Sequence, residues 1–437
     1  MSVATLTLCL VLFGQSPFEA DLQTRLHLRT AALDSAAVSW FQTRAGLVFK
    51  PIETDRVGSK IALELRADGF PTLGSVTQLG EPGLFEPVQV LLGEAYVRLY
   101  EALPGLNLTA GKQLVHWGTA DAINPTDNLN APDYSDPLTW DARRPSWMLH
   151  AEYAPVSALG LELAAKPVFE PAMSVPRRWF WMDNLPSIEM LRAGLVQQLI
   201  GQGLDSATAR QVASMYTIAA REDFQLPGNR LKDMTFGGRA KTHVSVLDLS
   251  ASLLRGYDFL PNAVPVTTVN PESLSMDFSL MERYARRTVV GADAAANVGG
   301  VGLWAEAGYS LYDDSLPEDE LSAIGGFDYT LAGFYLNCQY LHGQFPLAMA
   351  QTAGEPVKDY VLAALERKLF DDRLLLRLGG AVDAKKGSSA ILPLVRWMPV
   401  SGLQMDVGGL VFNGKSGSAF EPLDDNDEFF VGARYQF

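Results

Sequence analysis

Cysteine and basic charge are both scarce in this sequence. It has two cysteines, Cys9 and Cys338, in 437 residues. Cys9 lies in an apolar N-terminal run that we expect to be removed, so a disulfide framework and a cysteine-based zinc cluster are excluded. The 35 Lys and Arg residues are outnumbered by 50 Asp and Glu residues, giving a formal net charge of −15. Phosphate backbones need a basic binding face, so nucleic acid is not an expected partner.

Long apolar runs are missing as well, because no stretch reaches the ~18–20 residues that a membrane-spanning helix needs. The apolar run Val3–Phe13 has the length of the central region of a secretory signal. No Lys or Arg precedes Arg25, so the usual basic start of such a signal is absent. We expect residues 1–16 to be a signal peptide and residues 17–437 to form one domain.

The dominant pattern is alternation of apolar and polar residues with a period of two, which is typical of strands with two different faces. Ile61, Leu63 and Leu65, for example, alternate with polar or small neighbours. The pattern predicts strands at Asp21–Ala31, Val38–Lys50, Val57–Asp68, Val90–Glu101, Leu106–Trp117, Ser146–Ala154, Gly160–Phe169, Thr235–His243, Leu247–Tyr257, Tyr284–Ala295, Val301–Tyr312, Ser322–Leu331, Gly333–Gly343, Val357–Leu369, Leu374–Asp383, Ser389–Met398, Gly402–Asn413 and Asp427–Phe437.

The connections between these strands form a second regular pattern. They are short after even-numbered strands, such as Ala102–Gly105, and mostly long after odd-numbered ones, such as Gly118–Pro145. Short turns at one end and long loops at the other are typical of barrels in the bacterial outer membrane. The sequence therefore predicts an all-β fold, a transmembrane antiparallel β-barrel of about 18 strands, with 16 to 18 as the range.

One long connection differs in kind. Within residues 170–234, the segment Ser187–Ala220 has helical spacing of apolar residues, and Asp205 or Ser206 can cap a second helix. We expect a short helical insertion in one outer loop, too small to bury a core of its own. It should pack into the lumen or cap the outer mouth.

Several motifs resemble those of a known group of proteins. The last strand, Phe429–Phe437, is similar to the closing strand of outer-membrane barrels, whose terminal aromatic residue is an assembly signal. The stretch from Gly111-Lys112-Gln113 to Asn124-Pro125-Thr126-Asp127 resembles uncharacterised porin-like outer-membrane proteins, as do Arg286-Arg287 with Val290–Asp293, and Gln339–Gly343. The resemblance implies a barrel channel and names no solute. It also implies that the barrel assembly machinery is a partner, through the strand ending at Phe437.

Polar residues on the strands are candidates for the wall of a pore. An arginine facing lipid costs ~2–4 kcal/mol at the bilayer midplane, so these side chains are expected to point inward. Closing the barrel brings the first and last strands together, which places the set on one stretch of wall. The predicted pore-lining residues are Arg25, Arg44, Glu64, Arg66, Glu94, Arg98, Arg377, Arg396 and Arg434. Seven of them are arginines and we expect fewer acids there, so the wall is either a basic ladder for anions or a set of salt bridges.

The third outer loop, Gly118–Pro145, carries turn-forming and charged residues. It is either an ordered surface loop or a constriction folded into the lumen. The candidate constriction residues in this loop and the next are Asn124, Asp127, Arg143, Arg144, Arg177 and Arg178.

These features favour a porin-like outer-membrane channel for passive diffusion of small hydrophilic solutes, with a weak preference for anions. One alternative is a barrel that moves apolar or amphipathic compounds with the helical loop as a plug. A second alternative is a barrel hydrolase, which needs a Ser–His pair across strands; His116, His150 and His342 are the candidate histidines. A third alternative is a surface adhesin. Catalysis, metals and cofactors are not expected. The other expected partners are outer-membrane lipid, lipopolysaccharide and small solutes.

Overall fold

The computed structural model describes residues 18–29, 37–69, 88–121, 123–139, 141–173, 186–228, 230–313, 317–345 and 359–437. The predicted signal peptide and the candidate residues Arg177 and Arg178 lie outside these ranges. Among the described residues, no helix combines the length and the apolar character needed to cross a membrane.

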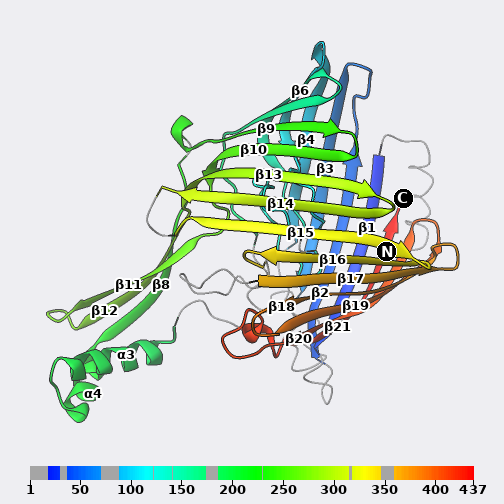
Figure 1. The fold of residues 1–437 in the computed structure, drawn as a ribbon. Helices are drawn as coiled ribbons and strands as arrows, with labels where there is room; N and C mark the ends of the chain where they lie inside the picture. Colours follow the sequence, from blue (N-terminus) through cyan, green and yellow to red (C-terminus); the bar gives the residue numbers. More distant parts are fainter. Residues whose placement is uncertain are drawn as a thin grey trace.

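Eighteen antiparallel strands form one closed sheet (Figure 1). Closure is made by β1 and β21, which pair from Asp21 with Gln436 to Arg29 with Glu428. The barrel strands are β1 (Phe18–Arg29), β2 (Ala37–Phe49), β3 (Val57–Gly69), β4 (Gln89–Leu103), β5 (Leu106–Gln113), β6 (Ser146–Val156), β7 (Leu159–Lys166), β9 (Thr235–Val244), β10 (Leu247–Tyr257), β13 (Arg286–Val298), β14 (Val301–Tyr312), β15 (Glu320–Leu331), β16 (Phe334–His342), β17 (Asp359–Leu369), β18 (Leu374–Asp383), β19 (Ser389–Val400), β20 (Leu403–Asn413) and β21 (Glu428–Gln436). Each corresponds to one of the eighteen predicted strands, so the prediction of the barrel is confirmed.

The two faces of the strands explain why this sequence closes into a barrel. On β3, Ile61, Leu63 and Leu65 are exposed on the outside, while Arg66 is buried inside. Exposed apolar side chains occur in the same way on the other strands around the barrel. The hydrocarbon core of a membrane requires such an outer surface. Closure pairs the edge strands with each other, so no edge is left with unpaired backbone groups.

Three further strands were not predicted. They are β8 (Thr217–Gln225), β11 (Asn262–Asn270) and β12 (Ser275–Arg283), and they form a separate sheet in which β12 pairs antiparallel with β11 and parallel with β8. These residues were expected to lie in long connections, and the second helix was expected within a helical segment that runs to Ala220. That helix ends at Met215, and Ala219 lies on β8.

The two predicted helices are present as α3 (Ile188–Gly201) and α4 (Ser206–Met215). The Asp205 side chain caps α4 by accepting from the backbone amides of Ala207 and Thr208. The helices and the separate sheet share one cluster of buried residues: Leu191, Leu195, Ala213, Tyr216, Ile218, Met276 and Phe278. We call α3, α4, β8, β11 and β12 the rim module.

The rim module projects from the end of the barrel that carries the long connections (Figure 1). We expected the helices to enter the lumen or cap the mouth, and that expectation was wrong. Two residues of the shared cluster, Met276 and Phe278, come from β12, which sequence analysis had not joined to the helices. The apolar sides of the helices are buried against this sheet, so they do not need the barrel lumen to cover them.

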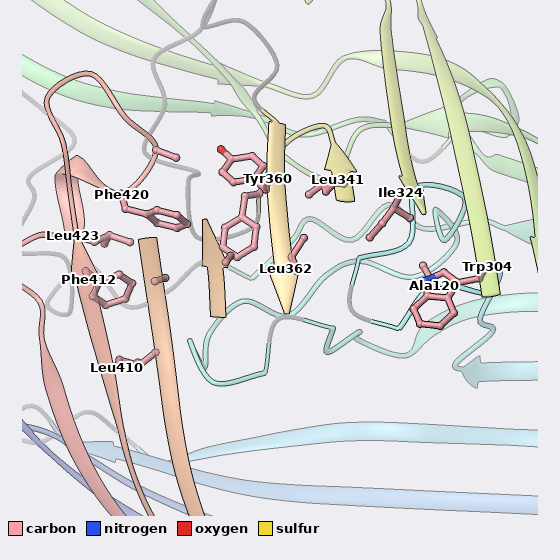
Figure 2. Packing of buried hydrophobic residues seen from close by; sticks show 14 of the residues in the cluster. Ala120, Trp304, Ile324, Leu341, Tyr360, Leu362, Leu410, Phe412, Phe420 and Leu423 are labelled. Carbon is pink, nitrogen blue, oxygen red and sulfur yellow. The ribbon is translucent and has the colours of Figure 1, made fainter. Parts of the chain in front are cut away.

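The largest apolar core lies inside the barrel, on the wall from β14 to β20. Figure 2 shows Phe420 and Leu423, from the connection between β20 and β21, lying near Phe412 and Tyr360. Among the connections that the structure describes, short 3-10 turns occur at η3 (Leu231–Asp233) and η5 (Glu421–Leu423). The cluster is made of Trp40, Ala120, Trp304, Ile324, Leu341, Phe345, Tyr360, Leu362, Ala381, Ala390, Leu410, Phe412, Ala419, Phe420 and Leu423.

Candidate functional site

The connection between β5 and β6, residues 114–145, folds into the barrel, and we call it the lumen loop. Its contacts reach strands on several sides of the wall. The Trp117 indole donates to Glu162 on β7 at 3.0 Å, and the Asn337 amide on β16 donates to Asp121 at 2.5 Å. These contacts favour the infolded form over a loop lying on the surface.

Glu306 on β14 fixes the first half of the lumen loop. Its carboxylate accepts from the backbone amides of Thr119 at 2.9 Å, Ala120 at 3.1 Å and Thr126 at 2.7 Å. The Thr126 hydroxyl donates to the same carboxylate at 2.8 Å, and the Asn124 amide approaches it at 3.4 Å. Five donors on one buried carboxylate hold the loop backbone in a single conformation.

Gly118 is required at this anchor. Its φ of +97° lies in the left-handed region, and a Cβ atom there would come 2.5 Å from both carboxylate oxygens of Glu306. The loop therefore approaches Glu306 at a position that only glycine can occupy without displacement.

Three predicted pore-lining arginines fix the second half of the loop. Arg25 donates to Asp136 at 2.7 Å, and Arg44 lies 3.7 Å from the same carboxylate. Arg66 donates to Ser135 at 2.8 Å and lies 3.5 Å from Asp133. Arg66 also donates to the predicted residue Glu64 on its own strand, at 3.1 Å. These arginines bind the loop and are largely removed from water.

The electrostatics of Asp136 follow from this arrangement. Burial alone would raise the pKa of its carboxyl group. The guanidinium groups of Arg25 and Arg44, together with the Leu138 amide, outweigh burial and hold the pKa below its ordinary value. Asp136 is therefore a carboxylate, and an anchor, at neutral pH.

The remaining constriction candidates bind within the loop or beside it. Arg143 donates to Asp127 at 3.3 Å, and the exposed His116 ring lies 3.4 Å from the same carboxylate. That hydrogen bond raises the pKa of His116 above its ordinary value. Asn124 donates to Ala120, and Arg144 donates to the carbonyl of Pro171 at 3.3 Å. Four of the six candidates thus lie in the lumen loop, and the other two lie outside the described residues.

The other predicted wall arginines lie towards the short-turn end of the strands. Arg98 pairs with Glu152, Arg377 with Glu366 at 3.3 Å, Arg396 with Asp406 at 2.9 Å and Arg434 with Asp21 at 3.4 Å. The predicted residue Glu94 pairs with Lys60. These pairs are partly exposed, in contrast to the buried anchors around Asp136.

The expectation that acids are fewer than arginines on this wall was wrong. Each of the seven arginines has a carboxylate within 4 Å: Asp136 for Arg25, Glu64 for Arg44, Asp133 for Arg66, Glu152 for Arg98, Glu366 for Arg377, Asp406 for Arg396 and Asp21 for Arg434. Two of these acids, Asp133 and Asp136, belong to the lumen loop. They lie far along the chain from the arginines they pair with, so the sequence does not indicate the pairing. The wall is a series of ion pairs.

All five histidines also pair with carboxylates. His116 pairs with Asp127, and the others pair with neighbours on the wall or at a turn: His27 with Glu428, His150 with Glu162, His243 with Asp248 and His342 with Asp359. Within the described ranges no Ser–His hydrogen bond is present, so the arrangement that a hydrolase needs is not found there. Nor do three or more metal-binding side chains gather in that part of the chain.

Sequence reasoning missed the strongest anchors of the loop. Glu306 is a single inward acid on an otherwise small and apolar strand, and that isolation was the available signal. Asp136 gave no signal, because nothing in the sequence indicates which wall a loop residue reaches.

Comparisons with solved structures place this geometry in a known fold. OccAB3 of Acinetobacter baumannii superposes with a TM-score of 0.50 at 10% identity, covering 96% of this chain and 99% of that one. OpdL of Pseudomonas aeruginosa gives 0.50 at 11% identity, with 97% and 99% covered. A BenF-like porin from Pseudomonas fluorescens Pf-5 gives 0.51 at 11%, with 97% and 98% covered. The chain has the fold of the outer-membrane porins. No family model and no curated protein matches the sequence.

Proposed function

We propose that this porin-fold chain is a channel in the bacterial outer membrane for small hydrophilic solutes, with a weak preference for anions. An 18-stranded barrel is wide enough for an aqueous channel, and the lumen loop narrows it. No step of this function needs a catalytic group or a cofactor.

Unequal exposure within the wall ion pairs carries the proposed preference. The exposed fraction of the side chain is 43% for Arg377 against 21% for Glu366, and 33% for Arg396 against 11% for Asp406. It is 46% for Arg434 against 30% for Asp21. At these three pairs a solute therefore meets more arginine than carboxylate surface, although the charges balance. In a narrow pore such local charge outweighs the net charge of −15.

The distribution of apolar surface argues against an apolar route. The inner cluster on β14–β20 is covered by the lumen loop and by the connection that carries Phe420 and Leu423. Those side chains are buried, so they offer no exposed apolar surface along which such a compound could pass. The plug assumed by that alternative is also missing from the lumen, since α3 and α4 belong to the rim module (Figure 1).

Single-channel recording in a planar lipid bilayer tests the proposal. The purified protein should give discrete conductance steps, and a KCl gradient should give a reversal potential displaced modestly towards the chloride equilibrium potential. An absence of steps from folded barrels would contradict the channel. A displacement towards the potassium potential would contradict the anion preference alone.

A further inference from the structure

A groove on the outer surface of the barrel crosses strands β4 to β10. It has a volume of about 900 Å³ and is lined almost entirely by apolar atoms. Large and small residues alternate across neighbouring strands in the first row, whose paired order is Val97, Ala110, Leu149, Ala165 and Phe236. A second row lies two residues further from the rim, and its small residues are Ala151 and Gly238, beside Leu99, Leu108 and Leu163. Leu149 and Leu163 protrude strongly, with 63% and 65% of their surfaces exposed. Between them, the small residues leave the hollow.

Cationic and aromatic side chains border this groove at its long-connection end. Lys112 pairs in register with Trp147, and Arg286 with Tyr257. The Arg286 guanidinium lies 5.6 Å from the centre of the Tyr257 ring. Aromatic and basic residues of this kind lie at the level of the lipid headgroups. The groove rows begin two and four residues below, about 7 and 14 Å along the strands, where acyl chains lie.

Arg255 adds a third cation at the edge of the hollow, in register with Phe236 in the first groove row. It lines the groove and donates to Thr288 at 3.0 Å and to Asp313 at 2.7 Å. Two acidic groups lie beside these cations: Asp313, which pairs with Arg255, and Asp233, which accepts from the Tyr257 hydroxyl at 3.0 Å. The border thus carries three cations, Lys112, Arg255 and Arg286, against two carboxylates.

We propose that this groove binds lipopolysaccharide, with a lipid phosphate on Arg255 and Arg286 and an acyl chain in the hollow over Ala151 and Ala165. The long-connection end of an outer-membrane barrel faces the exterior, and the lipid of that leaflet is lipopolysaccharide. Its phosphates complement the cationic border and its acyl chains fit an apolar groove. The inference rests on the outer-membrane position of the barrel and is independent of whether the lumen conducts.

A second copy of the chain is a less suitable occupant. A twofold contact between barrels in one membrane keeps both at the same height. The cationic border of each copy would then face that of the other, and like charges would meet in a medium of low dielectric constant. An anionic lipid removes that repulsion.

Native mass spectrometry of the delipidated, refolded barrel in nonionic detergent tests this inference. The probes are purified lipopolysaccharide and phosphatidylglycerol. The wild type should bind lipopolysaccharide more tightly than phosphatidylglycerol. Arg255→Gln with Arg286→Gln should weaken that binding roughly 30-fold, because each basic residue near a lipid surface contributes ~1 kcal/mol.

Two further variants separate the parts of the site. Ala151→Leu with Ala165→Leu fills the hollow and should also weaken lipopolysaccharide binding, whereas Asp313→Asn removes a competing anion and should strengthen it. The matched control is Arg367→Gln with Ala363→Leu, both on β17 and away from the groove. Like Arg286, Arg367 lies over an aromatic ring, 4.3 Å from the centre of Phe334. It should bind like the wild type. Heat-modifiable gel migration shows that each variant is folded.

Three results would overturn the inference. They are equal binding of the two lipids by the wild type, unchanged binding in both groove variants, and a wild-type dimer that the groove variants abolish. Channel recordings on the same variants keep this question separate from the proposed function, because the substituted residues lie outside the lumen.

Discussion

The Glu306 carboxylate on β14 and Thr126 in the lumen loop are joined twice, through the Thr126 amide at 2.7 Å and its hydroxyl at 2.8 Å. The two residues are 180 positions apart in the chain. The loop donates three backbone amides to this carboxylate, so it cannot leave the lumen without leaving several buried donors unsatisfied. The lumen loop is therefore part of the folded barrel, and its position depends on Glu306.

Removing this acceptor should loosen the constriction. In Glu306→Ala the donors from Thr119, Ala120 and Thr126 lose their partner, and each buried unsatisfied group costs ~1–3 kcal/mol. We expect larger and noisier single-channel conductance and a lower unfolding temperature of the barrel. The control is Glu272→Gln, in the exposed turn between β11 and β12. Conductance equal to the wild type in Glu306→Ala would show that the loop is held by its other contacts alone.

The Asp136 anchor predicts a pH dependence at acid pH. A carboxyl group with a lowered folded-state pKa adds stability above its unfolded pKa of about 3.9, and this stability is lost as pH falls through the folded-state value. Asp136 should therefore hold the loop down to a pH of about 4, and conductance should rise below that as the loop is released from Arg25 and Arg44.

Asp136→Ala should give the released state at every pH, because unpairing a buried ion pair costs ~3–5 kcal/mol. Recording single channels across the pH range compares this variant with the wild type. Asp205→Ala, which removes a helix cap in the rim module, is the control and should keep the wild-type curve. An acid transition that persists unchanged in Asp136→Ala would assign it to another group.

The sequence predicted the barrel far better than the site. Alternation is a local property of the sequence. On β3, for example, the neighbours Leu65 and Arg66 already indicate which face meets lipid and which face is buried inside the barrel. The pairing of Arg25 with Asp136 spans 111 positions and depends on where a long loop lies. The strands of the rim module were missed for a related reason. β8 has little polar alternation, and β12 alternates over only the six residues Ser275–Leu280. The two become a sheet only by pairing with each other across the chain.

Selectivity should depend on the exposed arginines and hardly on the buried ones. Replacing Arg377, Arg396 and Arg434 by Gln leaves Glu366, Asp406 and Asp21 unpaired, so the reversal potential in a KCl gradient should move towards cation preference. Arg66→Gln should mainly change conductance, because Arg66 is only 4% exposed and binds the lumen loop. A selectivity change of equal size in Arg66→Gln would mean that this arginine also meets the solute.

The rim module should be dispensable for conduction. Its helices pack on β8 and β12, and its cluster contains no barrel residue. Replacing residues 187–225 and 262–281 by short Gly-Ser linkers removes both halves together and leaves no apolar face exposed. Conductance and selectivity should stay at wild-type values in planar bilayers. A raised conductance would show that the module restricts the mouth after all.

The last residue of the chain should matter for assembly more than for the finished barrel. The Phe437 amide donates to the Ala20 carbonyl at 2.8 Å, and its ring packs edge-on against Tyr435 with the ring centres 4.8 Å apart. One backbone hydrogen bond contributes ~0.5–1.5 kcal/mol, which is small beside eighteen paired strands. Deleting Phe437 should therefore lower the amount of folded protein in outer-membrane fractions strongly, while the fraction that assembles keeps a nearly wild-type unfolding temperature. Phe437→Tyr retains a terminal aromatic ring and should restore the amount. Wild-type amounts of the deletion variant would show that the terminal aromatic residue is not read during assembly.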